Sequence, residues 1–242
     1  MRVFLFLSAL LLACSVASAE GVVVRVGTES TYPPYEFRDV SGSLVGFDVD
    51  LVAALAERLG WAVQWVEMPF DALIPALERG EIDLVAACLS CTPERARLVA
   101  FSDPYEITPS AFVVAAGDYF PTGPEALRGR VVAVQPGTAE DRYVIDLKFP
   151  LRRAFDRLDE AFAALAAGEV DAVFVDEPVA ASYVAGALNR GSFRLAFTLK
   201  LIGAEKALAL RRGACDRLDA VNEALQALRD GGLLAELARK WK

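Results

Sequence analysis

The chain has 242 residues, of which 55% are hydrophobic and 24% charged, and its formal net charge is −8. This length and composition suffice for one large domain or two lobes with a substantial buried core. The acidic balance, without a basic stripe, argues against nucleic-acid binding. Beyond the N-terminus there is no uncharged apolar run of about 18 residues, so no internal membrane span is expected.

Residues 1–19 are typical of an export signal. Arg2 supplies a minimal basic region, residues 3–13 are apolar, and Ala17-Ser18-Ala19 is a small-residue cleavage site. The alternative is a lipoprotein signal in which Cys14 is lipidated. We favour cleavage after Ala19, because that site lies just before the first predicted strand. The sequence therefore predicts an exported, periplasmic protein whose mature chain begins at Glu20.

The first part of the mature chain alternates between strand-like and helix-like patterns. Gly60 and Gly80 mark the ends of two amphipathic helices, as glycine commonly does. The expected elements are strands at 22–26, 63–67 and 82–87, a hairpin at 36–47, and helices at 48–59 and 70–79.

A second unit of the same style follows. Its expected helices are 125–128, 138–147, 159–167 and 177–188, with strands at 131–134, 152–155 (an edge strand) and 172–175. A last strand at 207–210 precedes closing helices at 215–229 and 233–241. This alternation predicts an α/β fold with largely parallel sheets. Ligands of open α/β sheets bind at the carboxyl ends of the strands.

A polar turn follows the apolar run 82–87. It contains Ser90 and, shortly afterwards, Arg95. The planar guanidinium of arginine can donate two parallel hydrogen bonds to a carboxylate, and a serine hydroxyl can accept from an ammonium group. The turn therefore suits a small zwitterion. Alternatively, Thr92 caps a short helix that Pro93 begins, and Arg95 is merely exposed.

Three cysteines remain after the expected cleavage: Cys88, Cys91 and Cys215. Export permits a disulfide between Cys88 and Cys91, and the alternative is that both are small residues that pack around the pocket. Zinc is not expected, because the chain has no second cysteine pair and no histidine. We expect neither a metal nor a cofactor.

Several blocks recur in a fixed order from about residue 22 to the C-terminus, and together they carry a resemblance to a known family. The blocks are Thr28-Glu29-Ser30-Thr31-Tyr32-Pro33-Pro34-Tyr35-Glu36-Phe37, Gly46-Phe47-Asp48-Val49-Asp50-Leu51, Phe70-Asp71-Ala72-Leu73-Ile74-Pro75-Ala76-Leu77, Thr92-Pro93-Glu94-Arg95, Phe101-Ser102-Asp103-Pro104-Tyr105, Gln135-Pro136-Gly137-Thr138 and Val170-Asp171-Ala172-Val173-Phe174-Val175-Asp176. The chain resembles the polar amino-acid family (family 3) of periplasmic solute-binding proteins, the ligand-capturing subunits of ABC transporters.

The resemblance implies a two-lobed periplasmic-binding-protein fold of type II, with mixed, mostly parallel sheets and the ligand between the lobes. Lobe 1 should comprise residues 20–108 plus 206–242, and lobe 2 residues 109–205. The hinge should lie in two extended crossings near 108–113 and 200–206. Periodicity alone does not predict that the chain returns to its first lobe.

The resemblance also implies a set of ligand-binding residues at strand ends and in the loops that follow. The set is Glu29, Tyr32, Phe70, Ala87, Cys88, Ser90, Arg95, Gln135, Thr138, Ala139 and Asp176. Cys88 departs from the family, which usually has a small residue such as glycine or serine there.

Each role in this set has an alternative. Arg95, helped by Thr138 at a helix N-terminus, should bind the α-carboxylate, although Thr138 could simply cap its helix. Asp176, with Ser90 and nearby main-chain carbonyls, should accept the α-ammonium, although Asp176 could cap the following helix. Tyr32 and Phe70 should sandwich the ligand's aliphatic stem, although isolated aromatic residues are more often core residues.

Glu29 is the main indicator of specificity. A carboxylate at the far end of the ligand favours a cationic or hydrogen-bond-donating side chain and disfavours aspartate and glutamate. Gln135 adds a neutral donor and acceptor. A polar or cationic L-amino acid is therefore the expected ligand, with arginine, lysine, ornithine, histidine, glutamine and cystine all possible.

The expected function is ligand capture by lobe closure, followed by delivery to the membrane permease of an ABC importer. We expect a monomer without catalytic activity. One alternative is an enzyme that resembles the exported cyclohexadienyl (prephenate or arogenate) dehydratases, with Glu29 or Glu177 as the acid; no extra basic residue is apparent for a second carboxylate. The other alternative is a ligand sensor domain that acts through a separate partner.

Overall fold

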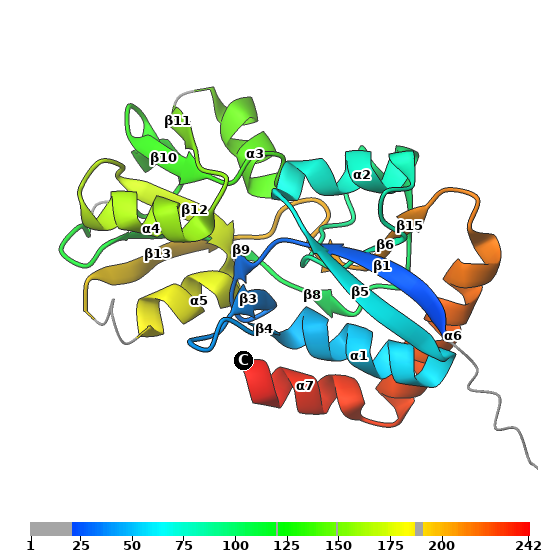
Figure 1. The fold of residues 1–242 in the computed structure, drawn as a ribbon. Helices are drawn as coiled ribbons and strands as arrows, with labels where there is room; N and C mark the ends of the chain where they lie inside the picture. The colour runs from blue at the N-terminus through cyan, green and yellow to red at the C-terminus, as the bar shows by residue number, and fades with distance from the viewer. Residues whose placement is uncertain (1–20, 120, 149, 187–190) are drawn as a thin grey trace, which may run out of the picture.

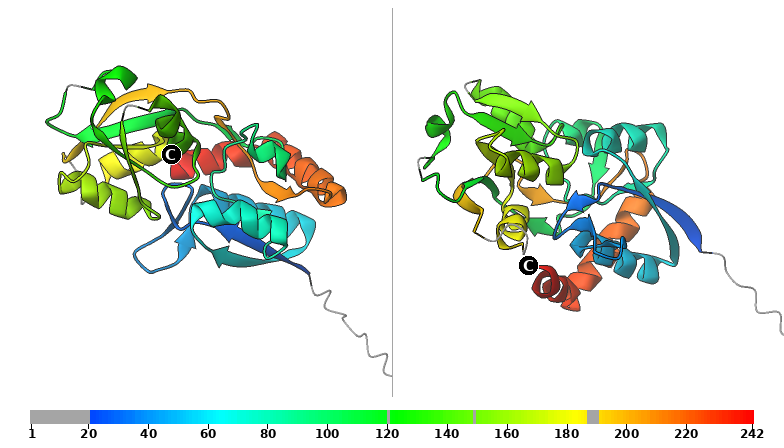
Figure 2. Two further views of the ribbon diagram at one scale, coloured as in Figure 1. Left: turned by 90° about the horizontal axis from the view of Figure 1, so that it is seen from above. Right: turned by 60° about the vertical axis from the view of Figure 1, so that its left-hand side comes forward.

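The computed structural model describes residues 21–119, 121–148, 150–186 and 191–242. These residues form two lobes, each built on a five-stranded sheet with flanking helices (Figure 1). The two further views in Figure 2 show the same division. The predicted two-lobed α/β fold is confirmed. The expected export signal and Cys14 lie outside the described residues.

The sheet of lobe 1 has the strand order β5-β1-β6-β15-β7. Strand β1 runs parallel to both β5 and β6, whereas β15 is antiparallel to β6 and β7. Helices α1 and α7 lie on one side of this sheet and α2 on the other (Figure 1). The strands are β1 (Val22–Thr28), β5 (Trp61–Glu67), β6 (Leu84–Val85), β7 (Val99–Phe101) and β15 (Ala209–Arg211), and the helices are α1 (Phe47–Leu59), α2 (Leu73–Arg79), α6 (Cys215–Asp230) and α7 (Leu233–Trp241), with 3₁₀ turns at Phe70–Ala72 and Arg95–Arg97.

The sheet of lobe 2 has the strand order β11-β10-β12-β9-β13. Strands β11, β10 and β12 are parallel, and β9 is antiparallel to β12 and β13. The strands are β9 (Ser110–Ala115), β10 (Val131–Val134), β11 (Leu151–Ala154), β12 (Ala172–Asp176) and β13 (Phe193–Leu199), and the helices are α3 (Ala139–Leu147), α4 (Leu158–Ala166) and α5 (Glu177–Ala185), with a 3₁₀ turn at Pro124–Leu127.

Two small sheets complete the fold. Strand β8 (Glu106–Ile107) pairs with β14 (Glu205–Lys206), which brings together two segments that lie about a hundred residues apart in the sequence. Strands β2 (Thr31–Tyr32), β3 (Glu36–Arg38) and β4 (Leu44–Val45) form an antiparallel sheet, so the hairpin predicted at 36–47 is confirmed.

The helix predicted at 70–79 is divided in the structure. Residues Phe70–Ala72 form a 3₁₀ turn, and α2 begins only at Leu73. This start places Pro75 in the first turn of the α-helix, where a missing N–H costs no intrahelical hydrogen bond. The proline therefore explains why the α-helix does not start at residue 70.

Two strands of lobe 2 escaped the sequence prediction. Residues 108–113 were expected to be an extended crossing, but Ser110–Ala115 form β9, an interior strand of the second sheet. No element was predicted at Phe193–Leu199, which form β13 at the edge. Both strands are antiparallel to their neighbours, so the parallel alternation that guided the prediction does not include them.

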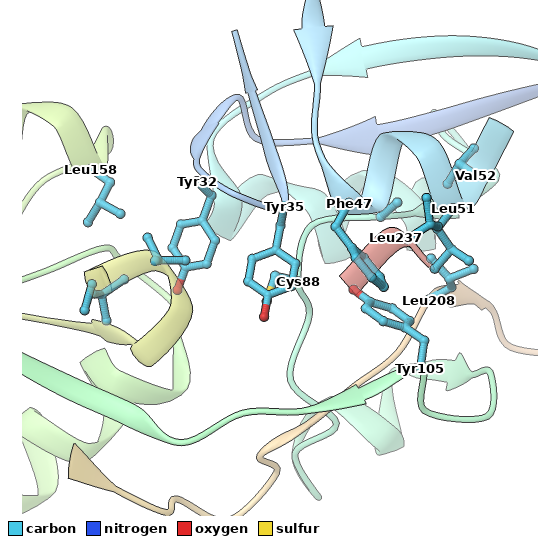
Figure 3. Close-up of a cluster of buried hydrophobic side chains, with 14 of the residues drawn as sticks. Tyr32, Tyr35, Phe47, Leu51, Val52, Cys88, Tyr105, Leu158, Leu208 and Leu237 are labelled. Carbon is cyan, nitrogen blue, oxygen red and sulfur yellow. The ribbon is translucent and has the colours of Figure 1, made fainter. Parts of the chain in front are cut away.

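The main buried apolar cluster extends across both lobes. In Figure 3, Tyr32, Tyr35 and Phe47 lie in a row, with Cys88 beside the ring of Tyr35. In lobe 2, the stacked rings of Phe112 and Phe174 lie 3.8 Å apart between their centroids. Among the described helices, none combines the length and apolar character needed to cross a bilayer.

Candidate functional site

A small enclosed space lies where the two lobes meet. Its volume is about 10 Å³, close to the minimum that holds one water molecule, so an amino acid fits only if lobes or side chains move. The lining includes nine of the eleven residues predicted from the sequence. The lining residues are Tyr32, Phe70, Ala87, Cys88, Ser90, Arg95, Thr138, Ala139, Glu140 and Asp176. A larger, more open hollow of about 580 Å³ also reaches Arg95, Thr138 and Ala139.

Arg95 is buried at the lobe interface. Its guanidinium donates to the carbonyl oxygens of Ser90 and Gly137, both at 2.8 Å, and lies 5.2 Å from the centroid of the Phe70 ring. Burial lowers the pKa of Arg95, although the Glu140 carboxylate opposes this effect. Within the described part of the chain, no carboxylate comes within ion-pair distance of this guanidinium. Arg95 is thus a buried cation that an anionic ligand group would neutralise.

Asp176 ends β12 and is fully buried. Its Oδ1 accepts from the Thr108 hydroxyl at 2.9 Å, and its Oδ2 accepts from the Tyr32 hydroxyl at 2.9 Å. The Asp176 side chain makes no capping hydrogen bond to α5. The helix-cap alternative for Asp176 is therefore wrong, and the carboxylate points instead to the lobe interface.

Lys206 was not among the site residues predicted from the sequence. Its side chain is 1% exposed, and its Nζ lies 2.7 Å from Asp176 Oδ1, 2.8 Å from Asp176 Oδ2 and 2.8 Å from Ser90 Oγ. Burial alone would lower the pKa of Lys206, but the Asp176 carboxylate raises it above the ordinary value, so the amine is an ammonium at neutral pH. The extra basic residue that was not apparent in the sequence is present beside Asp176.

The sequence does carry one signal for Lys206. Residues 207–210 are apolar and were predicted as a strand, so the charged residue immediately before them lies at the end of that predicted strand. Sequence reasoning assigned residue 206 only to a crossing, because the pairing of β14 with β8 depends on contacts between distant segments.

Tyr32 and Phe70 both line the enclosed space. Tyr32 is 6% exposed, and its ring points toward lobe 2 (Figure 3). Its hydroxyl donates to Asp176 Oδ2 at 2.9 Å. Phe70 presents its ring to the guanidinium of Arg95. The two aromatic residues thus contact the two principal charged residues of the site, in agreement with a position beside a bound zwitterion.

Cys88 has a backbone conformation that favours glycine. Its φ is 45°, its N–H donates to Asp48 Oδ2 at 2.7 Å, and its thiol lies 3.7 Å from Asp176 Oδ2. A positive φ is strained for residues with a Cβ atom, which is consistent with glycine being a usual residue at this point in the family. Cys88, Cys91 and Cys215 are separate thiols, and the described residues hold no cluster of potential metal ligands.

Thr138 caps α3, as its alternative interpretation predicted. Its hydroxyl accepts from Asp141 N at 3.0 Å and donates to Gln135 O at 2.8 Å. The helix N-terminus still faces the enclosed space, because Ala139 and Glu140 line it. Glu140 was not predicted; its carboxylate accepts from the Ser110 hydroxyl at 2.5 Å, and burial raises its pKa.

Glu29 and Gln135 do not line the enclosed space. The Glu29 carboxylate accepts from the Thr31 hydroxyl at 2.7 Å and from Thr31 N at 3.0 Å, and burial raises its pKa. Arg38 is paired with Glu67 instead of Glu29. Gln135 lies next to Glu29 and donates to Asp156 O at 3.0 Å. These two residues form a polar layer outside the lining of the enclosed space.

The arrangement offers a buried cation for a carboxylate, and a buried anion, Asp176, that Lys206 already contacts. The aromatic side chains that line the space come from lobe 1, and lobe 2 contributes Thr138, Ala139, Glu140 and Asp176. A family model described as bacterial extracellular solute-binding proteins, family 3, matches residues 24–242. The chain belongs to this family of solute-binding proteins. The resemblance predicted from the sequence blocks is thereby confirmed.

Members with known names and structures cover nearly all of the chain. A putative ABC transporter arginine-binding protein 2 from Escherichia coli (strain K12) is 30% identical over 237 residues, which is 97% of each chain. A solved structure of an ancestral arginine-binding protein bound to arginine is 37% identical, with a TM-score of 0.86, and covers 92% of this chain and 99% of that one. An ancestral amino acid-binding protein, a precursor of cyclohexadienyl dehydratase, is 33% identical, with a TM-score of 0.83 and coverage of 90% and 95%.

Proposed function

We propose that this family 3 solute-binding protein captures a polar or cationic L-amino acid between its lobes and delivers it to the permease of an ABC importer. The observation that carries the proposal is the buried Arg95 guanidinium, which has no carboxylate partner among the described residues and lies at the lobe interface. A ligand carboxylate would supply the missing charge. The lining from two lobes explains how capture could be coupled to closure.

Lobe closure would use the two crossings at β8 and β14. In this proposal, lobe 1 comprises residues 20–108 plus 206–242, and lobe 2 comprises residues 109–205. The short antiparallel pairing of Lys206 with Glu106 and of Glu205 with Ile107 holds the crossings side by side. Rotation about these crossings would open the space beside Arg95, and the permease would recognise the closed form of the monomer.

The proposed ligand class rests on charge and on relatives. The two arginine-binding relatives support a cationic amino acid. The acidic side chain of Glu29 lies in the polar layer next to the site, and a carboxylate there favours a cationic ligand end. The proposed ligands are arginine, lysine, ornithine or histidine, with glutamine as a neutral competitor.

A thermal-shift screen of residues 20–242, refolded from denaturant to remove any ligand, tests the proposal. The panel contains the twenty amino acids, ornithine, citrulline, cystine, prephenate and arogenate. A ligand at about 100 times its Kd should stabilise the protein by about 2.7 kcal/mol. Stabilisation by cationic or polar amino acids is expected. A panel without any stabilising compound would contradict ligand capture at this site.

An enzyme on the same scaffold is the second candidate, and Glu140 is the observation that favours it. This buried carboxyl lines the enclosed space, and its raised pKa would allow it to act as a general acid. Against it, the Lys206 ammonium is already bonded to Asp176 and Ser90, so it is not free for a second carboxylate. We therefore propose a binding protein without catalytic activity. Absorbance assays for prephenate and arogenate turnover distinguish the two candidates.

A further inference from the structure

The Lys206 ammonium occupies the position in which an amino acid's α-ammonium is expected. Its three donor contacts are Ser90 Oγ and both carboxylate oxygens of Asp176, all within 2.8 Å. These are the side chains assigned to the ligand ammonium in the sequence analysis. The protein thus provides its own cation for its own ammonium-binding groups.

The lysine is held there by its backbone as well as by its side chain. Lys206 pairs with Glu106 in the small crossing sheet, and its carbonyl accepts from Tyr105 N at 2.9 Å. It also forms an isolated β-bridge with Ser90, and the next residue, Ala207, donates to Leu89 O at 3.1 Å. The backbone segment that carries the ammonium is therefore hydrogen-bonded on both sides.

The acceptors have little remaining capacity. Besides Lys206, Asp176 accepts from Thr108 and Tyr32, so its two oxygens already have four hydrogen-bonding contacts at 2.7–2.9 Å. A ligand ammonium would have to displace Lys206 or share these acceptors with it. Sharing would bring two ammonium groups together in a buried site, where like charges repel strongly.

The charges of the site lead to the same conclusion. Lys206 and Asp176 neutralise each other, and no carboxylate in the described part of the chain lies within ion-pair distance of the Arg95 cation. The other acid in the lining is Glu140, and burial raises its pKa and so favours its neutral form. A ligand that carries one carboxylate and a neutral group on its α-carbon would balance Arg95 without adding a second cation. A 2-hydroxy or 2-oxo acid has this charge distribution.

We propose that Lys206 is a specificity-determining residue that substitutes for the ligand's α-ammonium, so that the site accepts 2-hydroxy and 2-oxo acids along with the corresponding amino acids. A site built to hydrogen-bond a ligand group binds an analogue without that group about 10⁴-fold more weakly, because the buried polar groups of the site are then left unpaired. In this protein Lys206 keeps Asp176 and Ser90 paired, so that penalty is absent. The inference rests on the proposed function, namely a carboxylate ligand bound by Arg95.

Calorimetry with two probes, L-arginine and its 2-hydroxy counterpart (2-hydroxy-5-guanidinopentanoate), tests the inference in the unmodified mature protein. We expect the Kd of the hydroxy acid to be no more than about tenfold above that of arginine, far below the roughly 10⁴-fold rejection in a site that requires the missing group. A preference for arginine of tenfold or more would overturn the inference while leaving the proposed function intact. This measurement does not depend on whether any variant folds.

The variant Lys206→Met should restore the demand for an α-ammonium. Arginine should then bind more tightly and the hydroxy acid more weakly. The Kd of the hydroxy acid divided by that of arginine should rise by about a hundredfold or more, toward the discrimination of about 10⁴-fold expected when Asp176 is unpaired. The matched control is Lys200→Met, because Lys200 is an exposed lysine just ahead of the same crossing. The Lys200→Met variant should bind both probes with the Kd values of the unmodified protein.

Two contrary results have different meanings. Weaker arginine binding by a folded Lys206→Met protein would overturn the inference alone, because it would show that the lysine assists the amino acid. Absence of binding by either probe, to the unmodified protein and to the variant alike, would overturn the proposed cationic ligand and the inference together.

Discussion

The Lys206 ammonium and the Asp176 carboxylate lie 2.7 Å apart, although one comes from the crossing strand β14 and the other from the end of β12 in lobe 2. Both side chains are almost fully buried. Such a pair has a large desolvation cost, which the Coulomb attraction and well-formed hydrogen bonds must offset. Thr108, Tyr32 and Ser90 supply those hydrogen bonds. The pair therefore ties the crossing to lobe 2.

Removal of one partner should destabilise the protein strongly. Asp176→Asn leaves a buried ammonium without its counter-ion, and we expect the free energy of unfolding to fall by about 3 to 5 kcal/mol. The double variant Asp176→Asn/Lys206→Met should recover much of this loss, because it removes both charges. Urea denaturation of the two single variants and the double variant measures the coupling. Additive effects of the two substitutions would contradict a coupled pair.

Arg95 should matter for binding more than for stability. Arg95→Met should weaken amino-acid binding by about 2 to 5 kcal/mol, because a carboxylate would then be buried without its partner. The unfolding free energy of the ligand-free protein should change little, since the variant also removes an unneutralised buried charge. Arg97→Met is the matched control, because Arg97 is an exposed arginine in the same 3₁₀ turn. Calorimetry that finds equal affinities for the two variants would remove Arg95 from the site.

Much of the site could be predicted because it lies close to recognisable local signals. Ser90 and Arg95 follow an apolar strand and Asp176 ends one, and the order of sequence blocks identified the family from which the roles of these residues were inferred. Lys206 could not be predicted, because its burial depends on the pairing of β14 with β8 and on an aspartate thirty residues away. Likewise Glu29 was expected at the ligand's far end, but Thr31 accounts for both of its oxygens.

Gly46 has a structural reason for its place in the sequence block before α1. Its φ is 139° and its ψ 178°, and a Cβ there would lie 2.0 Å from the carbonyl oxygen of Tyr35. This region of backbone conformation is essentially restricted to glycine. Gly46→Ala should lower the unfolding free energy by about 3 kcal/mol or more, from strain plus the clash. Gly42→Ala, at φ 81° with open space around it, should cost only about 1 to 2 kcal/mol. Similar losses in thermal denaturation would argue against the clash.

Asp48 should make stability depend on pH in the direction opposite to an ordinary paired carboxylate. Burial raises its pKa from 3.8 to about 6, although Cys88 N–H and the Tyr105 hydroxyl both donate to Oδ2. The folded state therefore favours the protonated acid. The free energy of unfolding is unaffected by this burial below about pH 4. It falls as the pH rises from 4 toward 6, and above that pH the loss stays constant at about 3 kcal/mol.

Asp48→Asn should remove that loss. The Asn carbonyl can accept from Cys88 N–H and Tyr105, and the amide replaces Oδ1, which has no hydrogen-bond partner. We expect the variant to exceed the unmodified protein in unfolding free energy at pH 7.5, with the advantage disappearing near pH 4. Urea denaturation at the two pH values measures this, with Asp219→Asn, an exposed aspartate of α6, as the control. A loss of equal size at both pH values would mean that the buried carboxylate contributes through its hydrogen bonds and that its ionisation carries no net cost.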